Sequence, residues 1–345
     1  MFIQRFTLGL LLTSSLLFSS IPAAHADDDK LVHLYSARKE ALIKPMLDQF
    51  TEQTGIEVKL ITSKADALLK RLQTEGRNSP ADVLLTTDAG RLHRAREAGV
   101  LQPIESDVLE KAVPENYRDV DGYWYGLSLR ARPIVYAKDR VKPEQLSTYE
   151  ALAEPAMKGR VCIRSSNNIY NQSLVASMIS TRGEAATEDW ATDFVKNFAR
   201  PPRGGDRDQI KAVAAGQCDV AVVNTYYLGV MLSSGTDDER AAAEKVAVFW
   251  PNQDGRGAHV NVSGAGVTAH AKHRDNAIKL VEFLLSPEVQ NWYARVNHEY
   301  PVVEGVESSE LLKDWGEFKA DNINLTELGR LNADALRLMD RAGWR

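Results

Sequence analysis

Short apolar runs alternate along the chain with stretches in which apolar residues recur every three or four positions. Near the start, the runs at 31–35, 58–61 and 81–86 predict strands, and the stretches at 41–51, 65–76 and 88–99 predict amphipathic helices. Strands that alternate with helices are typical of a sheet covered by helices, so we predict an α/β fold with mostly parallel strands.

A second set of the same kind follows an extended segment at 127–136. Its predicted strands lie at 161–164, 220–223, 246–250 and 264–269, and its predicted helices lie at 206–215, 273–285, 287–296 and 325–342, with a further helix that begins at residue 172. The 345 residues exceed the usual size of one domain, yet no Pro-rich linker or internal repeat separates two units. We therefore expect two α/β lobes joined by crossing strands, with 127–136 as one of them.

The first 26 residues have the pattern of a secretory signal peptide. Arg5 gives a positive start, residues 6–18 are mostly apolar, and a small-x-small cleavage site ends at Ala26. A membrane anchor is the alternative, but the apolar run is short and interrupted by Thr and Ser. We expect cleavage at this site and export of a soluble mature chain, which starts at about Asp27.

The composition is that of an ordinary soluble protein, with 44% hydrophobic and 26% charged residues. It gives no support for global disorder, a coiled coil or a collagen-like fibre. The formal net charge of -5 lacks the basic footprint of nucleic-acid-binding proteins, so we predict no nucleic-acid partner.

The chain has two cysteines, Cys162 and Cys218, and each opens an apolar run that predicts a strand. Two are too few for a disulfide-dense scaffold or for a four-thiolate zinc site. Neighbouring parallel strands would bring them together, and thiols in an exported protein usually pair. We predict a disulfide between them, with two buried free thiols as the alternative.

Signals of catalysis are weak throughout the chain. It contains no HExxH, G-x-S-x-G or Walker A sequence, and Ser36 and Lys39 form an S-x-x-K spacing without its companion motifs. His270 and His273 stand three residues apart, a spacing that we interpret as an exposed strand-to-helix junction in preference to a metal site. We predict that the protein is not an enzyme.

Tyrosine is the residue type that indicates a chemistry. Tyr226 and Tyr227 directly follow the predicted strand 220–223, and Tyr170 follows the strand 161–164 and a polar loop. Because the carboxyl ends of strands in an open α/β sheet face the ligand crevice, the three phenols could converge there. Phenolate oxygens suit a hard cation, and three of them would neutralise Fe³⁺ charge for charge. On this argument alone, packing of adjacent tyrosines is the alternative.

Several stretches, in order and over nearly the whole mature chain, resemble one known family. They are LYSAR at 34–38, TEGRNSPADV at 74–83, TDAGRL at 87–92, LRARPIVY at 129–136, RSSNNIYNQS at 164–173, NTYYLG at 224–229, NVSGAGV at 261–267 and HEYPV at 298–302. With these motifs the chain resembles the periplasmic ferric-ion-binding proteins of ABC iron importers, a group within the type II periplasmic binding fold. The resemblance implies an N-terminal lobe of 27–128 plus about 255–298, and a C-terminal lobe of about 133–250 plus 299–345.

The resemblance also implies that Tyr170, Tyr226 and Tyr227 are iron ligands in a cleft between hinge-linked lobes. Many relatives carry a His-Tyr pair just after the Tyr-Ser-x-Arg motif, and this pair supplies two further ligands. Lys39 and Glu40 stand at those positions here. In relatives with only three tyrosines, carbonate or a similar anion completes the metal's shell, so we expect such an anion in this protein.

The candidates to hold the anion are three arginines and a serine, because guanidinium groups fork onto carboxylate-like oxygens. They are Arg38, Arg130, Arg132 and Ser166. The residues alone leave alternatives open: Arg130 and Arg132 could be merely solvated, Lys39 could hold the anion, and Glu40 could ligate the metal. We expect Tyr35 to be a packing residue.

These expectations together describe a periplasmic solute-binding protein. It would capture Fe³⁺ through phenolates with a synergistic anion, and as a monomer it would deliver the iron to an ABC permease in the inner membrane. The alternative is the same fold binding a metal-free organic anion or a thiamine-like solute through its arginines and aromatic residues.

Overall fold

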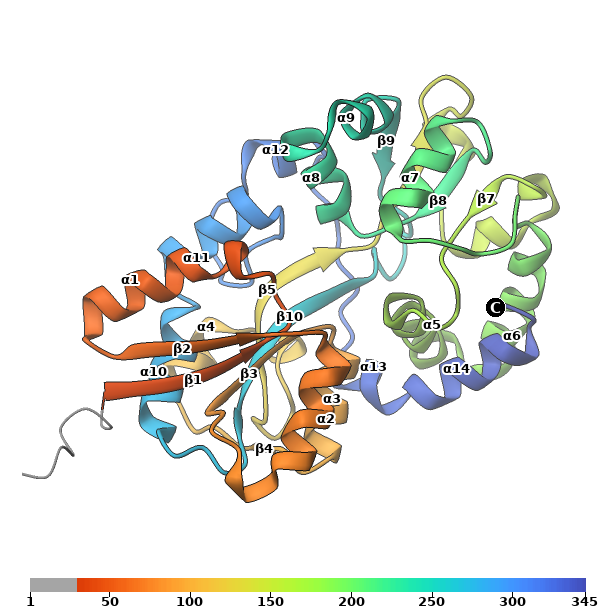
Figure 1. Ribbon diagram of the computed structural model, residues 1–345. Helices are drawn as coiled ribbons and strands as arrows, with labels where there is room; N and C mark the ends of the chain where they lie inside the picture. Colours follow the sequence, from red (N-terminus) through yellow and green to blue (C-terminus); the bar gives the residue numbers. More distant parts are fainter. Residues whose placement is uncertain (1–29) are drawn as a thin grey trace, which may run out of the picture.

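The computed structural model describes residues 30–345, and the predicted signal peptide therefore lies outside the described residues. Two separate sheets organise this part of the chain (Figure 1). We call the part built on the first sheet the N-lobe and the part built on the second sheet the C-lobe. The predicted two-lobed α/β fold is confirmed.

The N-lobe sheet has six strands in the order β2-β1-β3-β10-β4, with β5 also paired to β10. β1, β2 and β3 are parallel, whereas β10 is antiparallel to β3, β4 and β5. The strands are β1 (Leu31–Ser36), β2 (Glu57–Thr62), β3 (Val83–Thr87), β4 (Leu101–Gln102), β5 (Tyr125–Ala131) and β10 (Val260–Thr268). The helices packed against them are α1 (Lys44–Thr54), α2 (Ala65–Glu75), α3 (Ala89–Glu97) and α10 (Arg274–Phe283).

The C-lobe sheet has four strands in the order β7-β8-β6-β9. β7 and β8 are parallel, and β6 is antiparallel to both β8 and β9. The strands are β6 (Ile134–Ala137), β7 (Val161–Cys162), β8 (Val220–Val222) and β9 (Val246–Phe249). The helices of this lobe include α5 (Ile169–Arg182), α6 (Glu184–Lys196), α7 (Asp206–Ala214), α8 (Thr225–Ser234), α9 (Asp237–Ala243) and α14 (Asn332–Arg341). Shorter helices complete the described chain: α4 (Asp107–Ala112), α11 (Pro287–Trp292), α12 (Glu310–Lys313) and α13 (Thr326–Arg330).

The chain crosses between the lobes where the extended segment 127–136 was predicted. The segment is two strands, β5 and β6, that end and begin on either side of Arg132 and Pro133. Proline has no N–H to continue a ladder, which explains the break. β5 and β10 lie side by side where the chain passes from one lobe to the other (Figure 1).

The prediction of mostly parallel strands was wrong, because five of the eight strand pairings in the two sheets are antiparallel. Each sheet is mixed, because a strand that enters from the other lobe is inserted antiparallel: β10 in the N-lobe and β6 in the C-lobe. Such long-range pairing leaves no trace in local periodicity. The predicted lobe boundaries stay a prediction.

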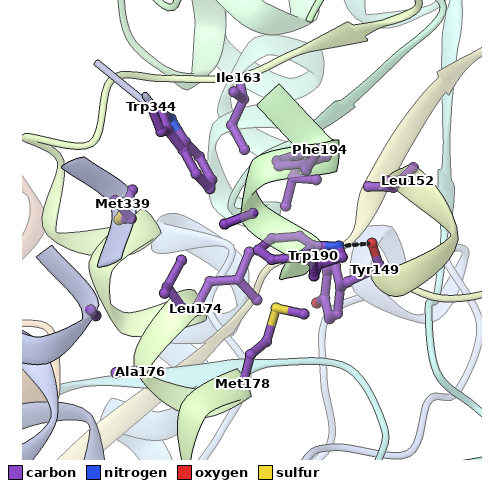
Figure 2. Close-up of a cluster of buried hydrophobic side chains, with 14 of the residues drawn as sticks. Tyr149, Leu152, Ile163, Leu174, Ala176, Met178, Trp190, Phe194, Met339 and Trp344 are labelled. Carbon is purple, nitrogen blue, oxygen red and sulfur yellow. Dashed lines mark hydrogen bonds between the residues drawn. The ribbon is translucent and has the colours of Figure 1, made fainter. Parts of the chain in front are cut away.

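A large aromatic cluster fills the core of the C-lobe (Figure 2). Trp190 stacks on Phe194 with ring centroids 4.8 Å apart, and Trp344 from the end of the chain meets both rings edge-on. The indole N–H of Trp190 donates to the carbonyl of Tyr149 at 2.9 Å, so the buried polar atom is satisfied. This packing fixes α5, α6 and α14 against one another.

The predicted disulfide between Cys162 and Cys218 is confirmed. It joins β7 to the residues that lead into β8, which are adjacent parallel strands. Among residues 30–345, no helix is both long and apolar enough to span a bilayer.

Candidate metal centre

The three candidate tyrosines stand at the first turns of two helices, α5 and α8. Tyr170 follows the N-cap residue Asn168, whose side chain accepts from the Tyr170 backbone N–H at 3.1 Å. Tyr226 and Tyr227 follow Asn224, the N-cap residue of α8. Both helices begin beyond the carboxyl ends of the parallel strands β7 and β8, where α/β sheets place their ligands. The positive ends of the helix dipoles favour a negative charge on these phenols.

The structure brings the three phenols together. The Tyr226 hydroxyl donates to the Tyr170 hydroxyl at 3.1 Å, and the rings of Tyr226 and Tyr227 lie 4.3 Å apart between centroids. All three side chains line one cleft of about 680 Å³. The cleft is therefore large enough for a metal ion with additional small ligands.

The phenols of Tyr226 and Tyr227 have raised pKa values, which keep them protonated in the absence of a cation. Burial, reinforced by Tyr170 and Asp206, raises the pKa of Tyr227 to about 12. Burial also raises the pKa of Tyr226 well above its usual value, and the neighbouring Tyr170 and Tyr227 add to the effect, while the Arg130 charge opposes it. A cation that binds here must therefore displace protons.

Of the arginines predicted to hold an anion, Arg130 is the one that is buried beside the phenols and keeps two unbonded donor nitrogens in the described part of the chain. It lines the cleft and is 2% exposed, and its Nη2 donates to the Val262 carbonyl and the Ser263 hydroxyl, both at 2.7 Å. Its Nε and Nη1 make no hydrogen bond within residues 30–345. The guanidinium carbon lies 5.9 and 5.8 Å from the ring centroids of Tyr170 and Tyr226. Two donor nitrogens of Arg130 therefore lack an acceptor beside the phenols.

Arg38 also lines the cleft, but its charge is already paired. Its Nη2 donates to Glu299 at 2.6 Å and to the Ser128 hydroxyl at 3.0 Å. Burial disfavours the Glu299 carboxylate, but the charges of Arg38 and Arg130 outweigh burial and lower the pKa of Glu299. An anion held by Arg38 would have to share it with this carboxylate.

Arg132 does not line the cleft; it supports the segments that carry Tyr170, Tyr226 and Tyr227. Its Nη1 donates to Asn224 at 2.9 Å and lies 3.3 Å from Asp206, and its Nη2 donates to Asn171 at 2.6 Å. It thus ties the start of α8 to the first turn of α5. Ser166 is likewise buried outside the cleft lining, where its carbonyl accepts from Gln172.

Lys39 and Glu40, at the positions where the resemblance implies a His-Tyr pair in many relatives, lie on different surfaces. Lys39 is exposed and lines the cleft, on the wall that the N-lobe supplies. Glu40 is exposed on a separate groove with Lys44 and does not line the cleft. Tyr35 is buried, and its hydroxyl donates to Glu75 at 2.9 Å, which agrees with a packing role.

Sequence reasoning missed two buried carboxylates at the site, Asp206 and Glu299. Asp206 accepts from the Asn224 backbone N–H at 2.8 Å and faces Arg132 and Arg164, each at 3.3 Å. In the sequence it reads as an ordinary acidic residue at the start of a helix, because its partners lie far away along the chain. It positions the loop that carries Tyr226 and Tyr227.

The segment with His298 and Glu299 packs closely against α8 and forms one wall of the cleft. A Cβ at Gly229 would lie 2.6 Å from the Cβ of His298, so only glycine fits at this point of the helix. His298 in turn bonds Ser233 through Nε2 at 2.7 Å. The segment that carries Glu299 is thereby pressed against the helix that carries Tyr226 and Tyr227.

Comparisons with known proteins agree with this picture. Residues 45–320 match the sequence pattern of the family described as bacterial extracellular solute-binding protein. Iron uptake protein A1 of Synechocystis is 52% identical over 314 residues, which cover 91% of this chain and 87% of that protein. The Fe(3+)-binding periplasmic protein of Serratia marcescens is 30% identical over 338 residues, which cover 97% and 96%.

Solved structures are similar over the same span. One described as Trichodesmium IdiA (FutA) in complex with iron and citrate ligands has a TM-score of 0.90 and 51% identity, covering 91% of this chain and 100% of that one. The ferric binding protein from Campylobacter jejuni has a TM-score of 0.86 and 38% identity, covering 91% and 100%.

Proposed function

The chain belongs to the bacterial extracellular solute-binding proteins and, within them, to the ferric-iron-binding group; from this premise we propose that Tyr170, Tyr226 and Tyr227 hold the iron. The protein captures Fe³⁺ outside the cytoplasm and passes it to an ABC importer. Its relatives are transport proteins, which favours a binding role over catalysis.

One observation carries the assignment of the ligands. Three phenols from two helix starts line one cleft, two of their hydroxyls are 3.1 Å apart, and a buried guanidinium stands beside them. Packing residues do not need to share a solvent-connected cleft. Deprotonating several phenols at one point costs free energy. A hard trivalent cation offsets this cost, because it binds their anionic oxygens directly.

Three protein oxygens do not complete an octahedral shell. We assign the remaining positions to a small carboxylate-like anion, such as carbonate, with water where the anion leaves room. Nε and Nη1 of Arg130, which make no hydrogen bond within residues 30–345, are the donors that we assign to this anion. The similar Trichodesmium structure is described with iron and citrate ligands, which supports a carboxylate in this role.

Lys39 is the second positive group that we assign to the anion. It lines the opposite wall of the cleft, in the N-lobe, and its exposed side chain is long enough to adapt to the anion's outer oxygens. Arg38 instead stabilises Glu299 and the segment that walls the cleft. Arg132 and Ser166 maintain the ligand loops.

The setting of this function follows from the relatives. The Serratia marcescens protein is described as periplasmic, and we infer the same location for this chain after removal of residues 1–26. The immediate partner is the membrane permease of the importer, to which the loaded protein docks as a monomer.

A visible spectrum of the iron-loaded protein tests the assignment. Phenolate-to-iron charge transfer should colour the wild type, and changing both Tyr226 and Tyr227 to Phe should abolish the colour. Tyr35→Phe is the matched control, since that phenol bonds Glu75 away from the cleft, and it should leave the colour unchanged. Retained colour in the double variant contradicts the ligand assignment, and calorimetry with iron-free carboxylates then tests a metal-free solute.

A further inference from the structure

Three potential metal ligands meet at the end of the N-lobe sheet that is remote from the tyrosine cleft. His33 lies in β1, Asp82 directly precedes β3, and His273 directly precedes α10. The pairing of the strands brings them together: the Asp82 N–H donates to the His33 carbonyl at 2.9 Å, and the Thr268 N–H at the end of β10 donates to the Asp82 carbonyl at 2.9 Å. Sequence spacing could not indicate this cluster, because its members are far apart along the chain.

The cluster is separated from the iron site by the length of the strands. β1 and β3 lead toward the cleft at their carboxyl ends, where Lys39 and Thr87 line it. His33 and Asp82 stand at the amino ends of the same strands. Thr87 is five residues along β3 from Asp82, so a rise of about 3.3 Å per residue puts the cleft wall roughly 17 Å from Asp82 along the strand.

The donor atoms have the spacing of ligands around one ion. The Nδ1 atoms of His33 and His273 lie 3.5 and 2.9 Å from Oδ2 of Asp82, and the ligand atoms of all three residues fall within 4.8 Å of one another. Metal–ligand bonds of about 2.0–2.2 Å place neighbouring ligand atoms about 3–3.5 Å apart in tetrahedral or octahedral shells. The two distances from Nδ1 to Oδ2, 3.5 and 2.9 Å, are close to this range.

The carboxylate is already oriented as in a built site. Asp82 is fully buried and accepts the backbone N–H groups of His33 at 2.8 Å and His273 at 2.9 Å. Such outer contacts fix a ligating carboxylate in metal sites. A purely structural aspartate would make the same contacts.

The Nδ1 atom of His33 favours the metal-binding role. It is shielded from solvent and makes no hydrogen bond within residues 30–345, although it points at the same carboxylate oxygen as His273. A shielded polar atom without a partner is costly, and a cation between the two imidazoles and the carboxylate would satisfy it. The side chains of His33 and His273 are 24% and 12% exposed, so an ion and water can reach the site.

We propose that His33, Asp82 and His273 bind a divalent transition-metal ion, with Zn²⁺ as the representative, independently of the iron cleft. Two imidazoles and one carboxylate suit borderline divalent cations, whereas the phenolate cleft suits a hard trivalent one. Three protein ligands leave the remaining positions to water.

The test uses the untagged mature protein in which Tyr226 and Tyr227 are both changed to Phe, so that metal in the iron cleft does not contribute. Equilibrium dialysis with Zn²⁺ gives the dissociation constant, and the visible bands of Co²⁺ report the ligand set. We expect one bound ion per chain. His33→Gln and His273→Gln should each raise the dissociation constant at least about tenfold, since loss of a ligand costs no less than loss of an outer contact.

His270→Gln is the matched control, because His270 is an exposed histidine near the same junction and does not belong to the cluster. It should bind Zn²⁺ as tightly as its parent. Zn²⁺ should also raise the melting temperature of the parent and of His270→Gln but not of the folded double variant His33→Gln/His273→Gln. Equal dissociation constants in the parent and the double variant, or an equal loss in His270→Gln, would overturn the proposal. Iron colour in the chain with intact tyrosines should be the same with and without these histidine changes.

Discussion

Tyr227→Phe gives the sharpest test of the proposed phenolate site, because the number of tyrosines that ionise on metal binding can be counted. The pKa of Tyr227 is raised to about 12, chiefly by burial. The pKa is therefore about five units above pH 7. Deprotonating the phenol at pH 7 costs roughly 7 kcal/mol, which metal binding must supply. Without a cation, no tyrosinate should form at this site near neutral pH.

The measurement is ultraviolet difference spectroscopy of the metal-free protein on addition of Ga³⁺, which has the charge of Fe³⁺ but no visible charge-transfer bands. Each phenol that ionises adds one tyrosinate increment to the difference spectrum. The wild type should gain three increments at pH 7, and Tyr227→Phe should gain two. Tyr35→Phe should still gain three, because that phenol donates to Glu75 outside the cleft.

The sign of the pH dependence follows from the same protons. Tyr226 and Tyr227, whose pKa values are raised, are protonated when the cleft is empty and would ionise when the metal binds. Metal binding should therefore weaken as the pH falls throughout the range below those pKa values. Each ligating phenol should contribute about a tenfold change in affinity per pH unit. An identical ultraviolet increment in Tyr227→Phe and the wild type, or no increment in the wild type, would refute the reasoning.

Three other changes separate anion binding, support of the loops and folding. Arg130→Met should remove the dependence of iron colour on added bicarbonate, measured by visible titration, because the free guanidinium N–H groups are lost. Asp206→Asn should lower the free energy of unfolding in urea by about 3–5 kcal/mol, since it leaves the buried Arg132 and the partly buried Arg164 without their carboxylate partner. Replacing Cys162 and Cys218 by Ser should lower it by about 4 kcal/mol in the chain-entropy estimate for a separation of 56 residues.

Much of the fold could be predicted from periodicity, and what could not has a common cause. The alternation of strands and helices indicated two α/β lobes, and the crossing segment was found at 127–136. The antiparallel insertion of β10 was not predictable, because β10 pairs with β3 and β5, which lie far back along the chain. Local patterns report which face of a strand is buried but not its neighbour.

The site shows the same division. The convergence of Tyr170 with Tyr226 and Tyr227 followed from their places after strands, since parallel strands end at one edge. Arg130 and Arg132 could not be told apart, because alternation puts both on one face of an ideal strand. Pro133 breaks that strand, and Arg132 turns to the polar groups at the starts of α5 and α7 while Arg130 stays beside the phenols.

The distribution of charge explains why an iron site can be built here without the His-Tyr pair. In the proposed site three phenolates balance Fe³⁺, so a further anionic ligand adds negative charge that the protein must offset. Arg130 supplies a buried positive charge with free donors, and Lys39 supplies another on the opposite wall, at one of the two replaced positions. On the proposed assignment, a lysine at a position where many relatives are expected to carry a metal ligand would change the N-lobe wall from one that binds metal to one that binds an anion. Closure of that wall would depend on the anion, which links iron release to loss of the anion as well as to proton uptake by the phenols.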